Sequence, residues 1–177
     1  SGSTWTIRIN AVDEPPGSFA GLSPADGEIV DTKSPLFDWE AAVDPDPGDY
    51  IASYAIWYST REDFAPAVRK SSAGLSEPGF TPAGALELIE NATYWWSVRA
   101  YDNDGYQRVS STRTVRINSE DELPAGFALA SPANCQVVAT KKPFFDWEDA
   151  PDPDPGDQVI YTLQYSQSAG FTVFTSK

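Results

Sequence analysis

Apolar side chains alternate with polar ones at every second position through most of the chain, which is the pattern of half-buried β-strands. The clearest stretches lie at residues 35–40, 51–60 and 94–100. Sequences that favour turns, such as Ser-Pro, Asp-Gly and Asp-Asn-Asp-Gly, separate such stretches. The pattern predicts an all-β fold with about seven strands in residues 11–118, and it predicts no helix of useful length.

The same alternation assigns individual side chains to the core or to solvent. Phe37 and Trp39 should point inward from their strand, whereas Trp57 should point outward from the next one. Residues 61–80 are polar and contain proline and glycine, so they predict an irregular connection that ends in one short strand. The final strand is predicted at about residues 109–117.

Much of the sequence repeats itself at an offset of 108 residues, from position 44 to position 152. Residues 44–49 spell Asp-Pro-Asp-Pro-Gly-Asp, and residues 152–157 spell the same hexapeptide, which is therefore expected to join two strands in two copies of one module. The repeat predicts that residues 1–10 are the last strand of a preceding copy, or a linker or tag. Residues 11–118 would form a complete module and 119–177 the first half of another. The chain would then be a window from a longer tandem array.

The complete module also carries a set of spaced aromatic positions. Trp39 points inward from the second strand, the third strand reads Tyr-x-Ile-x-Tyr, and Leu88 precedes Tyr94 by six residues. Together these positions resemble a fibronectin type III domain, and the spacing from Leu88 to Tyr94 is similar to that family's tyrosine corner. The resemblance implies an antiparallel β-sandwich of the fibronectin type III or immunoglobulin-like type. It also implies a role as a spacer or binding module.

The composition limits the binding partners and the catalytic chemistry that the chain can have. Lys and Arg number 12 against 26 Asp and Glu, and the net charge of −14 argues against nucleic acids and anionic membranes as partners. No apolar run approaches the ~18 residues that a membrane span needs, so no membrane insertion is expected. Histidine is absent and Cys135 is the only cysteine, which excludes histidine-dependent catalysis and zinc sites of the His/Cys type. The sequence predicts a protein that is not an enzyme.

Acidic residues are expected to gather at one end of each sandwich. The resemblance places the loop at 44–49, the turn at 102–105 and the incoming chain at the same end. Crowded carboxylates repel one another unless a cation screens them, and Ca²⁺ takes about six to eight such oxygens. The predicted calcium ligands are Asp13, Glu14, Asp44, Asp46, Asp49, Asp102 and Asp104 in the complete module, and Asp121, Glu122, Asp152, Asp154 and Asp157 in the partial one. The alternative is a stiff, solvated loop that stays acidic for solubility.

A second candidate surface is aromatic. The residues expected on the outward face of neighbouring strands are Trp57, Trp95, Arg99 and Tyr101. Exposed tryptophans can stack on sugar rings, which suggests a glycan-binding face. The alternatives are an arginine stacked on tryptophan or cover from the 61–80 connection.

These features predict a non-catalytic spacer or presentation segment of a tandem-repeat protein, either extracellular, on the cell surface or in the periplasm. Calcium at the junctions would rigidify it, and its partners would be neighbouring domains of the same polypeptide. One alternative is a carbohydrate- or protein-binding accessory module of an extracellular enzyme or adhesin. Another is a head-to-tail fibre, in which residues 4–10 of one chain complete the sandwich of the next.

Overall fold

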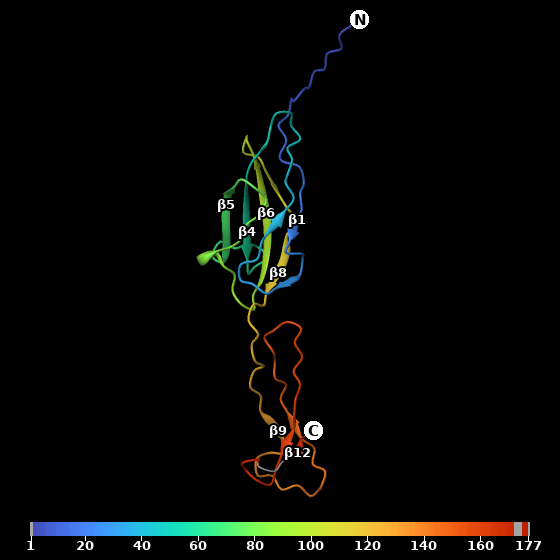
Figure 1. Ribbon diagram of the computed structural model, residues 1–177, viewed down its shortest axis with the longest axis vertical. Helices are drawn as coiled ribbons and strands as arrows, with labels where there is room; N and C mark the ends of the chain where they lie inside the picture. Colours follow the sequence, from blue (N-terminus) through green and yellow to red (C-terminus); the bar gives the residue numbers. More distant parts are fainter. Residues whose placement is uncertain (1, 172–174, 177) are drawn as a thin grey trace. The chain divides into compact units, whose positions relative to one another are not determined.

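The computed structural model describes residues 2–171 and 175–176 of the 177-residue chain. It separates into two compact units, Ser1–Glu120 and Asp121–Lys177 (Figure 1). The division falls two residues after position 118, where the sequence repeat ends its complete module. The assignment of the three segments to successive repeats stays a prediction.

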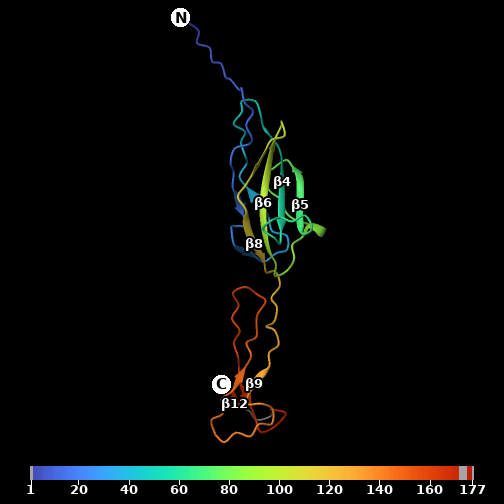
Figure 2. The ribbon, with the colours of Figure 1, turned by 180° about the vertical axis from the view of Figure 1, so that it is seen from behind.

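Two sheets form the sandwich of the first unit (Figures 1 and 2). The larger sheet has the strand order β2-β8-β6-β4-β5, with β7 also paired to β6. Its strands are β2 (Glu28–Val30), β4 (Ile51–Ser59), β5 (Arg69–Leu75), β6 (Thr93–Asp102), β7 (Gln107–Val109) and β8 (Arg113–Ile117). The smaller sheet pairs β1 (Gly21–Ser23) with β3 (Asp38–Trp39), and an isolated bridge joins Phe37 to Phe80.

The strand pairings settle the fold class. The described pairings in this unit are antiparallel except for β2 with β8, which is parallel. The first unit is therefore an antiparallel β-sandwich of the fibronectin type III or immunoglobulin-like type, which confirms the predicted fold class. Its one described helical element is the short 3₁₀ turn η1 (Gly84–Leu86), as the absence of a helical period predicts.

The core of the first unit consists of side chains that the alternating pattern assigned to it and of others, among them Val115 and Ile117, that it did not assign. Those exposed by 1% or less are Phe37, Trp39, Ile56, Tyr58, Tyr94, Trp96, Val98, Ala100, Val115 and Ile117. Phe37 joins the two sheets, because its ring stacks on Tyr58 at 5.6 Å and meets Trp96 edge-on at 5.2 Å. Burying each large apolar side chain contributes roughly 1.5–3 kcal/mol, so this aromatic cluster dominates the stability of the sandwich.

The predicted corner before β6 is present. Tyr94 is buried, and the backbone N–H of Ile89 donates to its hydroxyl at 3.2 Å. Leu88 is also buried, and its N–H donates to the carbonyl oxygen of Lys33 at 2.8 Å. These contacts fix the direction in which the chain enters β6 and confirm the corner that the spacing of Leu88 and Tyr94 predicts.

Two predicted elements differ from the structure. Residues 69–75 form a strand, β5, that pairs with β4 from Ser59 to Tyr54 with a register shift between Tyr54 and Ala55, so the predicted irregular connection is wrong there. β5 has polar side chains because it is paired only with β4 and buries little surface. The predicted final strand is interrupted between β7 and β8 by Ser110, whose hydroxyl accepts a hydrogen bond from Val98 N–H at 3.0 Å.

The second unit contains two short strand pairs. β9 (Leu129–Ser131) pairs with β10 (Asp146–Trp147), and β11 (Gln164–Tyr165) pairs with β12 (Thr175–Ser176). The tyrosine and tryptophan that meet in the first unit have counterparts here, since Trp39 and Tyr54 lie 5.7 Å apart and Trp147 and Tyr161 lie 5.6 Å apart. Within the described part of the chain, no helix has the length and hydrophobicity needed to cross a membrane.

Candidate metal centre

The loop at residues 44–49 is shaped by its own side chains and backbone. The carboxylate of Asp44 accepts a hydrogen bond from Asp46 N–H at 2.9 Å, and Asp49 N–H donates to the carbonyl oxygen of Asp46 at 3.2 Å. Gly48 has a φ of +107°, which glycine adopts without steric cost. As a result, carboxylate oxygens of Asp44, Asp46 and Asp49 lie within 4.8 Å of one another.

The segment that enters the sandwich closes over this loop. Glu14 N–H donates to Asp46 Oδ2 at 2.6 Å, and Asp46 is only 5% exposed. The side-chain amide of Asn10 lies 2.6 Å from Asp46 Oδ1 and 2.9 Å from the carbonyl oxygen of Val12. With its nitrogen on that side, Asn10 donates to both oxygens. Asp46 is thus enclosed between its own loop and the incoming chain.

The turn after β6 supplies a second set of carboxylates at the same end of the unit (Figures 1 and 2). Asp102 Oδ1 accepts hydrogen bonds from the N–H groups of Asp104 and Tyr106, at 3.0 and 2.8 Å. Asp102 is 5% exposed, and its Oδ2 is buried without a hydrogen-bond partner. A buried carboxylate oxygen without a donor is unusual in a native fold and requires an explanation.

Asn103 connects the turn to the loop, and sequence reasoning missed it. Its side-chain oxygen accepts a hydrogen bond from Tyr50 N–H at 2.9 Å. Its nitrogen donates to Asp104 Oδ2 at 2.9 Å and to Asp49 Oδ1 at 3.3 Å. Carboxylate oxygens of Asp13, Asp49 and Asp104 consequently lie within 4.8 Å of one another. The sequence shows Asn103 only as a residue typical of turns, with no signal for the contact to Asp49.

The predicted ligands of the first unit therefore do gather at one end, and no basic side chain neutralises them. Among the residues that the structure describes, no lysine or arginine forms an ion pair with any of the seven. The pKa of Asp13 is raised, first by loss of hydration and then by the negative charges around it, Asp104 foremost. The pKa of Glu14 is raised, first by a hydrogen bond with the Asp46 side chain and then by its charge. Repulsion from neighbouring carboxylates contributes to both pKa shifts.

The second unit builds its loop in the same way. Asp152 Oδ1 accepts a hydrogen bond from Asp154 N–H at 3.0 Å, and Glu122 N–H donates to Asp154 Oδ2 at 2.8 Å. Asp154 is 4% exposed, and its Oδ1 is buried without a hydrogen-bond partner. Carboxylate oxygens of Asp121, Asp154 and Asp157 lie within 4.8 Å of one another. Asp152, a predicted ligand, shapes the loop and lies outside this group.

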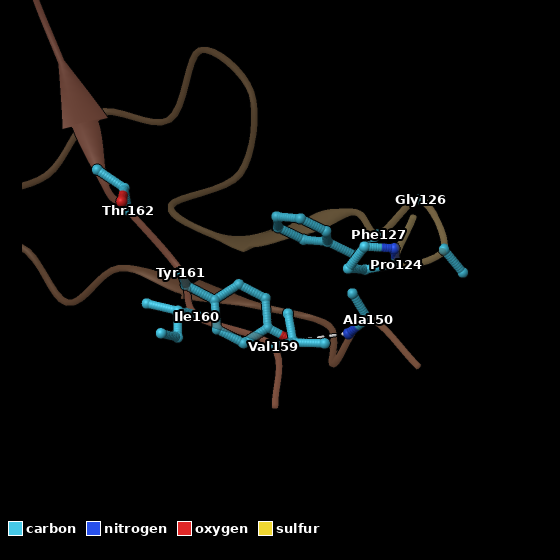
Figure 3. Close-up of a pocket in the computed structure, with 9 residues that line it drawn as sticks. Pro124, Gly126, Phe127, Ala150, Val159, Ile160, Tyr161 and Thr162 are labelled. Carbon is cyan, nitrogen blue, oxygen red and sulfur yellow. Dashed lines mark hydrogen bonds between the residues drawn. The ribbon is translucent and has the colours of Figure 1, made fainter. Parts of the chain in front are cut away.

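A tyrosine hydroxyl holds the base of each loop. Ala42 N–H donates to the hydroxyl of Tyr54 at 2.9 Å, and Ala150 N–H donates to that of Tyr161 at 2.7 Å (Figure 3). Figure 3 also shows the Phe127 ring beside Tyr161, at a centroid distance of 5.3 Å. The cavity that these side chains border has a volume of about 460 Å³ and a mainly apolar lining, so it adds no ligand to the acidic group.

The aromatic surface is arranged differently from a sugar-binding platform. The guanidinium carbon of Arg99 lies 3.2 Å from the ring centroid of Trp57, and that of Arg69 lies 3.7 Å from it. Two guanidinium groups this close to one centroid cannot share a face, so each covers one side of the ring. This geometry favours the alternative of arginine stacked on tryptophan. Glycan binding by Trp57, Trp95, Arg99 and Tyr101 stays a prediction.

Comparisons with known proteins give structural likenesses only. The sequence matches no protein-family model and no curated protein. Similar solved structures include an α-L-rhamnosidase from Dictyoglumus thermophilum, 18% identical, with 70% of this chain and 16% of that chain covered and a TM-score of 0.47. An Fn3-like protein from Clostridium thermocellum is 17% identical, with coverages of 62% and 98% and a TM-score of 0.40. The sixth fibronectin type III domain of human fibronectin type III domain containing protein 3 is 15% identical, with coverages of 66% and 96% and a TM-score of 0.42.

This chain spans less than a fifth of the length of the rhamnosidase. The catalytic activity in that protein's name therefore does not carry over to this chain.

Proposed function

We propose that the chain is a non-catalytic spacer or presentation segment of an extracellular protein, and that calcium binds at the acidic end of each sandwich unit. The neighbouring domains of the same polypeptide would be its partners. Bound calcium would tie the incoming chain to the loop and so fix the direction in which that chain enters the sandwich.

The observation that carries this proposal is a buried aspartate built twice in the same way. Asp46 and Asp154 are 5% and 4% exposed, and each accepts a hydrogen bond from the N–H of the incoming glutamate. A carboxylate held away from water without a positive partner is costly, since desolvation disfavours its charged form. A bound cation would offset that cost, and it would also satisfy the unpartnered oxygen of Asp154.

The ligand chemistry favours calcium over other metals. The available donors are carboxylate, amide and carbonyl oxygens, and the sequence has no histidine and one cysteine, which disfavours zinc. Calcium–oxygen distances are about 2.3–2.6 Å, so oxygens around one ion lie up to about 5 Å apart, and the carboxylate oxygens of each group lie within 4.8 Å of one another. If the Asn10 amide turned to present its oxygen, that oxygen would join those of Asp46 and Val12 as a ligand.

The expected energetic effect is modest. A site with a dissociation constant of about 0.1–1 mM in about 1–2 mM calcium contributes only about 0.4–2 kcal/mol. That is enough to order the chain segment that carries Asp13 and Glu14, and it is less than the core contributes. The proposal therefore assigns calcium to stiffness and orientation, and it leaves folding to the aromatic core.

Thermal unfolding with and without calcium tests the proposal. At about 2 mM Ca²⁺ the melting temperature should rise by roughly 2–8 °C over the calcium-depleted protein. The double variant Asp46→Asn, Asp154→Asn should lose the rise, because it removes the charges and keeps one oxygen that can accept the N–H of the incoming glutamate. The control Asp31→Asn changes an exposed aspartate outside the carboxylate groups described above, and it should keep the calcium-dependent rise in melting temperature. A wild-type melting temperature that does not change with calcium would refute the proposal. So would a double variant whose melting temperature still rises with calcium.

A further inference from the structure

Two groups of carboxylates share the acidic end of the first unit. The inner group is Asp44, Asp46 and Asp49, and the outer group is Asp13, Asp49 and Asp104. In each group the carboxylate oxygens lie within 4.8 Å of one another, and Asp49 belongs to both. The other two residues differ between the groups, so Asp49 is the residue at which the two groups meet.

A buried carboxylate oxygen without a hydrogen-bond partner lies within the inner group, and another lies beside the outer group. In the inner group, Asp44 Oδ2 is buried without a hydrogen-bond partner, while Asp44 Oδ1 is engaged with Asp46 N–H. Beside the outer group, Asp102 Oδ2 is also buried without a hydrogen-bond partner, and Asp102 is only 5% exposed. Asp102 Oδ1 accepts a hydrogen bond from the backbone N–H of Asp104, a member of the outer group, at 3.0 Å. These oxygens have no hydrogen-bond donor in the fold, and a bound cation would satisfy them.

We propose that the first unit binds two divalent cations, one in each group, with the Asp49 carboxylate bridging them. This inference rests on the calcium proposal above. The seven carboxylates carry a formal charge of −7, so one calcium ion leaves −5 and two leave −3. The second ion therefore relieves repulsion that the first cannot, and it satisfies Asp102 as well as Asp44.

The two positions should differ in affinity. The inner group contains a buried residue, Asp46, and the Asn10 amide holds the carbonyl oxygen of Val12 beside it. The outer group contains two exposed residues, Asp13 and Asp104, which water hydrates more fully. The inner ion should bind more tightly, and the outer ion should complete its coordination with water. In the described part of the second unit there is a single group, Asp121, Asp154 and Asp157, so the whole chain should bind three ions.

Counting bound calcium on the full chain tests the inference. Equilibrium dialysis against saturating ⁴⁵Ca²⁺ should give three ions per chain for the wild type. Asp104→Asn should give two ions, because it removes the outer position only. Asp49→Asn should give one, because it removes the ligand that both positions share. Asp154→Asn should give two, and the control Asp31→Asn should give three.

The outcomes separate this inference from the proposal on which it rests. A wild type that binds two ions, unchanged in Asp104→Asn, would mean one ion per unit, which overturns the inference and leaves the calcium proposal standing. A wild type that binds none would overturn both. An Asp49→Asn chain that binds two ions, with the far-ultraviolet circular dichroism of the wild type, would show that Asp49 does not bridge.

Discussion

At the residue scale, the feature that matters most is an aspartate buried at the centre of each loop. The alternating prolines and Gly48 indicate a stiff loop whose carboxylates converge, and the structure brings Asp44, Asp46 and Asp49 together. The burial of Asp46 has another cause, the contact with Glu14 N–H from a segment 32 residues earlier. Sequence reasoning could place both segments at one end, and it could not show that one covers the other.

Glu90 binds the chain at the C-terminal end of the first unit, next to Glu120. Its carboxylate accepts hydrogen bonds from the backbone N–H and the hydroxyl of Ser119, and Lys33 lies 3.6 Å away. These contacts lower the pKa of Glu90, the Ser119 hydroxyl foremost. We expect Glu90→Gln to reduce the free energy of unfolding by about 1 kcal/mol at pH 7, as measured by urea denaturation.

The effect of Glu90→Gln on the free energy of unfolding should depend on pH, and the lowered pKa of Glu90 gives the direction. A carboxyl group with a lowered folded-state pKa stabilises the fold fully above its ordinary value of 4.5, and this contribution is lost as pH falls through the lower folded value. The difference between wild type and Glu90→Gln should therefore shrink toward pH 3. Glu77→Gln, at an exposed position, is the matched control and should stay near zero throughout. A Glu90→Gln difference that is constant from pH 7 to pH 3 would contradict the role of the charge.

At the element scale, the strands that the sequence predicted best are those with an unbroken apolar face toward the core. The strand β6 was predicted over residues 94–100, because Tyr94, Trp96, Val98 and Ala100 alternate without a break, and the structure extends it to Thr93–Asp102. The strand β5 was missed, since its residues are held by backbone pairing to β4 and leave no hydrophobic pattern. Backbone hydrogen bonds along a sheet edge have no side-chain signature, so polar edge strands resemble loops in a sequence.

The glycine of each acidic loop should be needed for the shape of that loop. Gly48 and Gly156 have φ values of +107° and +93°, and a Cβ built on either would meet no atom within 4 Å. The cost of alanine is therefore conformational alone, roughly 1–3 kcal/mol. We expect Gly48→Ala to lower the urea midpoint of unfolding and to weaken calcium binding by displacing Asp49.

The control for this prediction is Gly126→Ala. Gly126 also has open space around its Cβ position, and its φ lies outside the region that disfavours other residues. This substitution should leave stability unchanged or slightly increase it, because alanine restricts the unfolded chain. If Gly48→Ala unfolded at the same urea concentration as the wild type, the backbone of residue 48 would not be what shapes the loop.

At the scale of the whole molecule, the two units share backbone features that follow the sequence repeat. Positive φ values recur at Gly27 and Cys135, at +78° and +62°, and at Phe64 and Phe171, at +49° and +48°. The fold class could be predicted because the hydrophobic spacing and the turn residues both indicate short strands separated by turns along the chain. The candidate site was predicted as a set of acidic residues. Its division into two groups, and the part played by Asn103, depend on contacts that no local pattern encodes.

The stabilisation that calcium gives the whole chain should grow as pH rises. In the metal-free fold the pKa values of Asp13 and Glu14 are raised above their ordinary values of 3.8 and 4.5. A carboxyl group with a raised folded-state pKa stabilises the fold below its ordinary value and loses that contribution as pH rises through the higher folded value. The metal-free protein therefore loses stability in the window in which these groups ionise. Calcium binds the ionised forms, so its effect should increase across the same window.

Melting temperatures at a series of pH values, with calcium and after calcium depletion, give this effect as a difference. Glu90 and the other carboxylates outside the acidic ends of the units titrate alike in both samples, so their contributions cancel. In the variant Asp13→Asn, Glu14→Gln the difference should depend less on pH, because two of the groups for which protons and calcium compete are gone. A difference of the same size at pH 4 and pH 7 in the wild type would mean that calcium does not bind where these carboxylates ionise.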